Sequence, residues 1–326
     1  MPSKLLRRVK LFLPFIGLII LFLIVYSLNI NAIIDAFLSI DPWYVIVALA
    51  LSLPMILART AAWQLIMRDQ KIHVGFLYSA KLFLIGLFYG IITPGYVGEL
   101  ARVAYLKGHT EEPYGKLFVN TVVETFVHTI SLYGMMVIGA VLVSGTLPNL
   151  LPLTALWIIA ACLIALYFTR KGPGEKLFHF LISHAIPKKM QGQLSSFVDT
   201  FYLDFPHFKA MILPFVFGVS TWIIVFTQEY IIALSLGLAI PYFMFLLLYP
   251  IANTAGFIPI TFAGLGTREF TAILIFSTLY AIPEEKVLVL SLVGFMVTDV
   301  FVGLLGFLLS LTETSVKNQD TAITGD

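Results

Sequence analysis

The chain alternates between long apolar runs and short polar intervals. Runs of about 18 or more apolar residues are long enough to cross the hydrocarbon core of a bilayer as a helix, and they recur along the whole sequence. A short loop marked by Asp35 and Asp41 is expected after the first of them. The pattern predicts six spanning helices, at about 11–30, 44–67, 117–144, 151–169, 212–236 and 287–311.

Two further apolar segments are interrupted by residues that disfavour an unbroken helix. The segment at about 76–93 runs into YGIITPGYVGELARVAYL (89–106), where a Pro-Gly pair precedes a glutamate and an arginine. The segment at about 241–258 runs into NTAGFIPITFAGLGTREF (253–270), which also combines Gly and Pro with an Arg-Glu pair. Broken backbone and charge at membrane depth are tolerated only where protein or a water-filled cavity surrounds them. These two segments are therefore the candidate functional site.

Composition agrees with a membrane protein. Of the 326 residues, 59% are hydrophobic and only 12% are charged, and the mean hydropathy is +0.96; soluble globular domains carry about 25% charged residues. The run at 11–30 is too long for an ordinary signal-peptide core and no small-residue cleavage site follows it, so we expect an uncleaved first helix. The single cysteine, Cys162, excludes an intrachain disulfide.

Lys and Arg concentrate in the cytoplasmic loops of membrane proteins, which allows two topologies to be compared. If every apolar segment simply crossed the membrane, the basic interval 170–210 would lie outside. If instead 76–106 enters from the cytoplasm, breaks and returns, most of the 20 Lys and Arg residues lie inside, and Lys286 is the basic residue left in an outer loop. The second topology is favoured. By the same logic, 241–282 forms a hairpin that opens from the outside, and both termini are cytoplasmic.

The predicted fold is an all-α polytopic membrane bundle of about six spanning helices plus two re-entrant broken hairpins of opposite orientation, an inverted pseudo-repeat. We expect a single membrane domain over 1–312, with hairpins at about 76–106 and 241–282, and a polar cytoplasmic tail at 313–326. Within the cytoplasmic interval 170–210, apolar residues recur at helical spacing. This spacing indicates an amphipathic helix that either lies on the membrane surface or caps the bundle.

The two interrupted segments resemble each other as a diverged repeat. Each has a glycine, an apolar pair and a proline, then a Gly-rich turn, then Glu and Arg at the start of a new helix; a chance likeness of two such turns is the alternative. Glu99 precedes Arg102 by three residues, which places both on one helical face, whereas Arg268 and Glu269 are adjacent. Paired interruptions in two inverted halves point to a transporter binding site.

These residues suit an anionic headgroup. A helix that begins within the membrane presents unpaired backbone N–H groups and a partial positive charge. Arg102 and Arg268 carry planar donors that match phosphate, while Glu99 and Glu269 either orient the arginines or carry a coupling proton. The glycines that would let an anion approach the backbone closely are Gly95, Gly98, Gly264 and Gly266.

The motifs PGYVGELAR (94–102) and FIPITFAGLGTRE (257–269) resemble the transmembrane region of lysylphosphatidylglycerol synthases and of their stand-alone, flippase-like (YbhN-like) relatives, over roughly residues 10–312. In two-domain members this region is held to flip aminoacylated lipid, while a soluble C-terminal domain attaches the amino acid. The sequence stops at Asp326 without that domain, so lysyl transfer is not expected. Some relatives carry a family 2 glycosyltransferase label, which no nucleotide-sugar domain or DxD motif supports here.

Further polar residues fall within the predicted spanning helices. Asn120, Glu124 and His128 recur every four residues and form a stripe that must face the bundle interior. The stripe is interpreted as a proton relay, as part of a headgroup cavity, or as a hydrogen-bonded seam between helices. Because Glu124 and His128 supply at most two ligands, we expect no metal site.

For other charged residues within the predicted spans, the sequence does not identify the ion-pair partners. Arg59 and Asp299 lie within predicted spans, and Arg59–Asp299 and Arg268–Asp299 are both candidate ion pairs. Lys81 is expected to extend to the inner interface. Glu229 lies near the outer end of its helix, where it is either functional or simply solvated.

The motifs leave three functions to compare. No Ser/His/Asp or Cys/His set, P-loop, GxGxxG or CxxC is present, so we expect no catalytic residues, no cofactor and no ATP-driven pump built by this chain alone. The favoured function is a lipid transporter, of flippase or scramblase type, that moves an anionic phospholipid or a polyprenyl-phosphate-linked lipid between leaflets. The alternative is a membrane-embedded lipid-modifying transferase, acting by aminoacyl or glycosyl transfer, or its membrane subunit. A non-catalytic scaffold for envelope lipid enzymes is the third.

Partners and location follow from the favoured function. The expected partners are membrane lipids, a proton as the candidate coupling ion and an enzyme of lipid or envelope synthesis as the candidate protein partner, with no nucleic acid. The expected location is the plasma (cytoplasmic) membrane.

Overall fold

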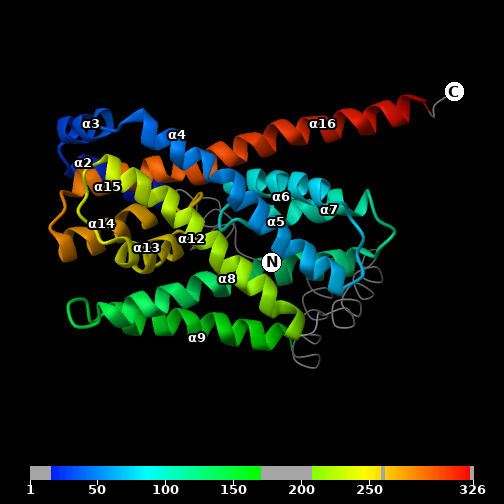
Figure 1. Ribbon diagram of the computed structural model, residues 1–326, viewed down its shortest axis with the longest axis horizontal. Helices are drawn as coiled ribbons and strands as arrows, with labels where there is room; N and C mark the ends of the chain where they lie inside the picture. Colours follow the sequence, from blue (N-terminus) through cyan, green and yellow to red (C-terminus); the bar gives the residue numbers. More distant parts are fainter. Residues whose placement is uncertain (1–15, 170–207, 258–260, 324–326) are drawn as a thin grey trace, which may run out of the picture.

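A computed structural model of the chain describes residues 16–169, 208–257 and 261–323. All regular elements in this part of the chain are helices, as the sequence predicts (Figure 1). In chain order they are α2 (Ile16–Ser27), α3 (Ile30–Leu38), α4 (Pro42–Ala50), α5 (Ser52–Asp69), α6 (Phe76–Ile91), η2 (Val97–Ala101), α7 (Arg102–Lys107), α8 (Tyr114–Leu142), α9 (Leu150–Thr169), η3 (Phe208–Met211), α12 (Ile212–Ser235), α13 (Tyr242–Gly256), α14 (Thr267–Tyr280), α15 (Glu284–Phe295), η4 (Met296–Val300) and α16 (Phe301–Ile323).

The chain is a multi-pass membrane protein. The helical stretches that are long and apolar enough to cross a membrane within the described residues are Pro42–Asp69, Tyr114–Leu142, Lys209–Ser235 and Glu284–Glu313. They correspond to four of the six predicted spans. α2 and α3 together would make a fifth, but they are bent by 97° relative to each other. The count of six spans stays a prediction.

Residues 30–38 form helix α3, so the prediction of a loop around Asp35 was wrong. The side chain of Asn29 accepts hydrogen bonds from the backbone N–H groups of Asn31, at 3.0 Å, and Ala32, at 3.3 Å. An Asn at this position begins a helix because it satisfies donors that have no partner within the helix. The aspartate that was taken to mark a loop instead lies on the exposed side of a short helix that buries Ala36.

Two of the spans change geometry partway along their length. α4 ends and α5 begins at Leu51, and Pro54 lies in the first turn of α5, where a missing N–H is tolerated. α15 and α16 are joined by η4, a short stretch of π-helix that carries Thr298 and Asp299. Such π-turns within α-helices are frequent at functional sites.

The two interrupted segments turn back within the bundle. α6 ends at Ile91, the chain turns through positive φ at Gly95 (64°) and Tyr96 (57°), and η2 and α7 follow. α13 likewise ends near the middle of the molecule, and α14 returns toward the end from which α13 came (Figure 1). The two turns meet, because an isolated antiparallel bridge pairs Pro94 with Phe262.

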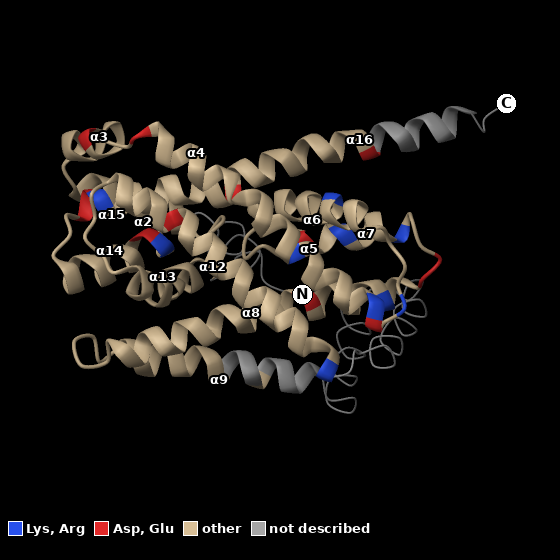
Figure 2. Cartoon of the chain, viewed as in Figure 1, with Lys and Arg blue, Asp and Glu red and all other residues tan. Residues whose placement is uncertain are grey.

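The turn-backs lie toward opposite ends of the long axis. The connections 70–75 and 108–113, which flank α6 and α7, lie at one end, together with the C-terminal part of α16 (Figure 1). The connections 236–241 and 281–283, which flank α13 and α14, lie at the other end. Lys and Arg residues gather at the α7 end of the chain trace and are sparse at the α14 end (Figure 2). The opposed orientation of the two hairpins in a membrane stays a prediction.

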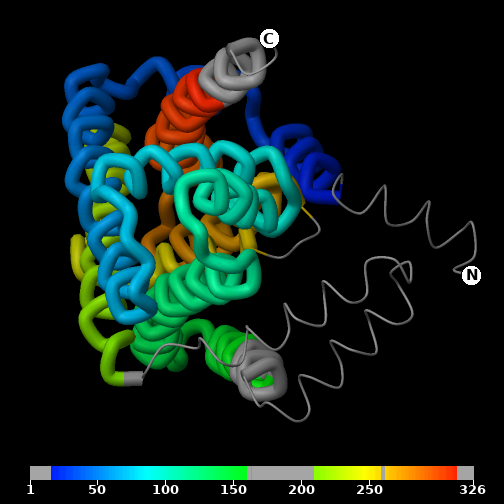
Figure 3. The backbone as a smooth tube through the Cα atoms, turned by 90° about the vertical axis from the view of Figure 1, so that its right-hand side faces the viewer, coloured from blue at the N-terminus to red at the C-terminus, as the bar shows by residue number. Residues whose placement is uncertain are grey.

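Each turn-back has its own hydrophobic cluster. Buried side chains of α13 and α14, such as Phe245 and Phe276, pack with α8, α12 and α15. Buried side chains of α6 and α7, such as Leu82 and Leu106, pack with α5. Seen along the long axis (Figure 3), the residues 76–107 lie near the centre, with α5 and α12 on one side and α2 on the other. The broken segments are therefore largely surrounded by protein.

Two predicted features lie at or beyond the ends of the described ranges. The amphipathic helix predicted at 170–210 lies outside the described residues except for η3. The predicted boundary between membrane domain and tail at 312/313 is not a break in the helix, because α16 continues to Ile323. The predicted division into domains is otherwise untested.

Candidate functional site

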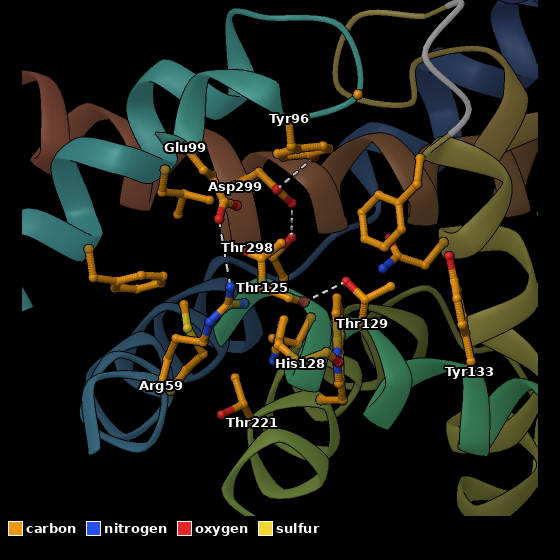
Figure 4. A pocket seen from close by; sticks show the side chains of 18 of the residues that line it. Arg59, Tyr96, Glu99, Thr125, His128, Thr129, Tyr133, Thr221, Thr298 and Asp299 are labelled. Atoms are coloured by element: carbon orange, nitrogen blue, oxygen red, sulfur yellow. Dashed lines mark hydrogen bonds and ion pairs between the residues drawn. The ribbon is translucent and has the colours of Figure 1, made fainter. Parts of the chain in front are cut away.

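A cavity of about 270 Å³ lies where the two turn-backs meet (Figure 4). Its lining residues come from α5, α6, η2, α8, α9, α12, α13 and η4, so both the spans and the two interrupted segments contribute to its wall. The charged and amide side chains on the wall are Arg59, Glu99, Glu229, Asn253 and Asp299. The aromatic side chains are Phe83, Tyr96, His128, Tyr133, Trp157, Trp222 and Phe257.

Four charged residues from four elements form one cluster beside this cavity, which we call the first ion-pair cluster: Arg59, Glu99, Arg102 and Glu124. Glu124 lies at its centre. Arg59 Nε donates to Glu124 Oε1 at 2.6 Å, and Arg102 Nη2 donates to Glu124 Oε2 at 2.5 Å. Glu99 Oε2 lies 3.7 Å from Nη2 of both arginines. The cluster therefore balances two positive with two negative charges.

Packing and hydrogen bonds hold the first ion-pair cluster in place. The guanidinium of Arg102 stacks on the ring of Trp63, 4.6 Å from its centroid, and the side chain is 1% exposed. Trp63 Nε1 in turn donates to Asn120 Oδ1 at 2.6 Å, and Asn120 Nδ2 donates to Gln70 Oε1 at 2.7 Å. The predicted stripe of Asn120, Glu124 and His128 is thus buried, as expected, and its first two members order the arginines.

A second ion pair lies at the start of α14. Glu269 Oε1 accepts from Arg268 Nη2 at 2.8 Å and from Ser291 Oγ at 3.0 Å, and Glu269 Oε2 accepts from the backbone N–H of Gly266 at 2.5 Å. Arg268 stacks on Phe295, 4.7 Å from the ring centroid, and is 2% exposed. Glu269 therefore caps its own helix and also neutralises Arg268.

Within the part of the chain that the structure describes, Asp299 and Glu229 have no arginine partner. Tyr96 OH donates to Asp299 Oδ1 at 3.0 Å and Thr298 Oγ1 donates to Asp299 Oδ2 at 2.7 Å (Figure 4). Glu229 is 2% exposed, and its Oε2 has no hydrogen-bond partner among the described residues. Of the two alternatives left open for Glu229, a solvated residue near a helix end does not agree with the structure, because the side chain is buried against Gly294 of α15.

The candidate ion pairs proposed for Asp299 differ from those in the structure. Arg59 pairs with Glu124 and Glu99, and Arg268 pairs with Glu269. Lys81, predicted to reach the inner interface, forms an ion pair of 2.7 Å with Glu313 on α16. Spacing along the sequence could not select these partners, since they come from helices far apart in the chain.

Most of the predicted glycines allow close contact between backbone segments and do not line the cavity. Of the four predicted glycines, Gly95 lines the cavity, and its φ of 64° is one that an L side chain rarely adopts. At Gly98 a Cβ atom would overlap the carbonyl of Tyr89, so this glycine brings η2 against α6. Gly264 and Gly266 likewise pack against the backbone of α13 and α2.

The helix starts also differ from simple anion sites. The N–H of Gly98 donates to Thr93 Oγ1 at 2.7 Å, and the N–H of Gly266 is used by Glu269. Since these donors are already paired, the side chains on the cavity wall are left to recognise a ligand.

The predicted site residues thus divide into two groups. Arg59, Gly95, Glu99, His128 and Asp299 line the cavity together. A second set does not line it and consists of Arg102, Asn120, Glu124, Gly98, Gly264, Gly266, Arg268 and Glu269.

Several wall residues were missed or given another role in the sequence analysis. Tyr96 and Asn253 were not singled out, although each lies within one of the two quoted segments. Trp222 also belongs to the wall, where its ring stacks on that of His128, with centroids 4.4 Å apart. Aromatic residues in an apolar chain carry no signal that separates a cavity wall from the core.

Comparison with known proteins matches nearly the whole chain to the family that the two sequence motifs resemble. A family model described as the lysylphosphatidylglycerol synthase TM region matches residues 11–306. A UPF0104 membrane protein of Methanocaldococcus jannaschii is 25% identical over 323 residues, which cover 93% of this chain and 96% of the relative. A UPF0104 membrane protein of Methanothermobacter thermautotrophicus is 22% identical over 282 residues, covering 80% and 83%.

Proposed function

The chain belongs to the family of the lysylphosphatidylglycerol synthase transmembrane region, and from that premise we propose that it is a membrane lipid transporter of flippase or scramblase type. Its substrate is an anionic lipid, a phospholipid or a polyprenyl-phosphate-linked lipid, whose headgroup passes through the cavity between the two turn-backs. The observation that carries the proposal is a cavity that places charged side chains within an apolar bundle and is walled by both broken segments.

The membrane arrangement that we propose has six spans and two re-entrant hairpins. α6–η2–α7 opens to the cytoplasm and α13–α14 opens to the outside, with both termini cytoplasmic and the chain in the plasma membrane. The charge distribution supports this orientation, because Lys and Arg gather at the α7 end of the bundle (Figure 2). Opposed hairpins that meet at a central site are the geometry that transporters use to expose a site to each side in turn.

Arg59 is the phosphate contact in this proposal. Among the described residues it is the one Lys or Arg that lines the cavity. Its Nε is held by Glu124, which fixes the plane of the guanidinium, and its Nη2 lies 3.7 Å from Oε2 of Glu99 on the cavity wall. Arg102 and Arg268, predicted to bind phosphate directly, are instead assigned to positioning, because each is nearly fully buried against its own carboxylate.

An apolar groove beside the cavity supports a lipid over a soluble anion. The groove has a volume of about 330 Å³ and lies between α6 and α16. Phe88 and Val300 on its wall directly follow Leu87 and Asp299 on the cavity wall. A headgroup in the cavity could thus remain attached to a hydrocarbon chain in the groove, which would avoid exposing either part to the wrong environment.

Translocation of fluorescent lipid tests the proposal. Purified protein is reconstituted into vesicles that contain NBD-labelled phosphatidylglycerol, and dithionite quenching follows transfer between leaflets. Arg59→Gln is expected to slow transfer about tenfold or more, since hydrogen bonds to a charged group contribute about 1.5–3 kcal/mol, while Arg59→Lys retains part of the rate. Lys81→Gln is the matched control, because Lys81 pairs with Glu313 away from the cavity.

Two results would count against the proposal. Wild-type rates no higher than those of empty vesicles, for phosphatidylglycerol, phosphatidic acid and polyprenyl phosphate alike, would remove the transport function. A folded Arg59→Gln protein that transfers lipid as fast as the wild type would remove the role of Arg59.

A further inference from the structure

We propose that Glu229 and Asp299 form a site for one monovalent cation, a proton or an alkali-metal ion, whose binding is coupled to lipid movement through the cavity. The inference rests on the proposed transport function and names its energy source. Neither residue is used by the ion pairs described above, yet both line the cavity.

The charge balance around the cavity is the first argument. The arginines Arg59, Arg102 and Arg268 are matched by the carboxylates of Glu99, Glu124 and Glu269. Glu229 and Asp299 are in excess, because no Lys or Arg nitrogen of the described residues lies within 4.0 Å of either carboxylate. An ionised carboxylate in an apolar interior is strongly destabilising unless it is neutralised. A bound cation would supply the missing charge.

Glu229 has the environment of an unfilled binding group. It is 2% exposed, it lines the cavity, and its Oε2 has no hydrogen-bond partner among the described residues. The other charged or titratable groups that face it are Tyr249 on α13, Arg268 and Glu269 on α14, and Asp299 on η4. Arg268 is engaged by Glu269, so it cannot act as the counter-ion of Glu229 without breaking that pair.

Oxygen atoms surround the same part of the wall. Asp299 already accepts from Tyr96 and Thr298, which fix both of its carboxylate oxygens. The side chain of Asn253 also lines the cavity and adds an amide oxygen to its wall. Carboxylate, hydroxyl and amide oxygens are the ligands that hard cations prefer, and the carboxylates can equally hold a proton.

Tyr96 provides a physical connection between this site and the elements proposed to move. Its hydroxyl donates to Asp299, while its backbone forms the turn of the first hairpin with a φ of 57°. Its ring packs edge-on against Phe257, at the end of α13, with centroids 5.7 Å apart. Neutralising Asp299 would weaken the Tyr96 hydrogen bond. Because Tyr96 belongs to the first broken segment and contacts Phe257 of the second, the change would affect both segments.

Infrared difference spectroscopy of the detergent-purified protein detects binding of a proton or an alkali-metal ion at the site in the absence of transport. A proton on Glu229 gives the C=O stretch of a buried carboxylic acid, which disappears in alkaline buffer. An alkali-metal ion instead shifts the carboxylate bands when sodium or potassium chloride replaces choline chloride. We expect one of these signals in the wild type and its loss in Glu229→Gln, with a change in Asp299→Asn. Glu284→Gln, which alters an exposed residue of α15, should leave the signal unchanged.

The absence of both signals in the wild type, or a signal that persists in both Glu229→Gln and Asp299→Asn, would overturn the cation site. Coupling is then tested by imposing a pH or sodium gradient on the vesicles. We expect the gradient to accelerate lipid transfer in the wild type, with loss of this dependence in Glu229→Gln. Transfer that occurs but ignores every gradient refutes the coupling and leaves the transport function intact, whereas a cation signal without any transfer refutes the transport function alone.

Discussion

At the scale of single residues, Glu124 is the buried carboxylate that binds two arginines. It is 2% exposed and accepts hydrogen bonds from Arg59 and Arg102, whose guanidinium groups come from different elements. The two buried guanidinium groups share this carboxylate, while Glu99 lies farther from both, at 3.7 Å. Removal of the charge on Glu124 would therefore leave an uncompensated positive charge in the cluster. The position of the cavity-lining Arg59 therefore depends on a residue that does not touch the cavity.

Glu124→Gln tests this dependence. We expect the substitution to lower the free energy of unfolding by about 3–5 kcal/mol, measured by SDS titration of the purified protein. Glu112→Gln is the control, because its ion pair with Lys116 is partly solvated and such pairs contribute at most about 1 kcal/mol. Equal stability of the two variants would show that Glu124 does not hold the arginines together.

At the scale of elements, the two broken segments could be predicted from sequence because Pro94, Gly95 and the later Gly-rich turn interrupt otherwise apolar runs. The stripe on α8 could also be predicted, since spacing of four residues fixes a common helical face. The partner of each charge could not. Arg59 and Glu124 are 65 residues apart, and which helices become neighbours depends on packing that no local pattern records. α3 was missed because its capping residue, Asn29, was not considered.

The contact between the two turns is the element-scale prediction. Residues opposite each other in an antiparallel bridge have Cα atoms about 4.5–5.5 Å apart, which is within the range for a disulfide. In a Cys162→Ala background, Pro94→Cys combined with Phe262→Cys should form a disulfide under mild oxidation, detected by mass spectrometry of the linked peptides. The single variants, and the double variant after reduction, should show no link. If the folded double variant does not form this disulfide, the two turns are not in contact.

At the scale of the whole molecule, the bundle is organised around two opposed units. Each interrupted segment has its own hydrophobic cluster, and the two units approach each other at the bridge and at the cavity. The spans α5, α8, α12 and α15–α16 surround them. If the two units open to opposite faces of the membrane, a headgroup at the cavity can be reached from either leaflet by movement at the turns. Transport by this route therefore depends first on the orientation of the two units in the membrane.

The measurement that tests it most directly is cysteine accessibility in intact cells. In the Cys162→Ala background, Thr110→Cys reports on the connection after α7 and Glu284→Cys on the start of α15. A membrane-impermeant maleimide should label Glu284→Cys from outside and should label Thr110→Cys only after the membrane is permeabilised. Labelling of both positions from the same side would contradict opposed hairpins and, with them, the transport proposal.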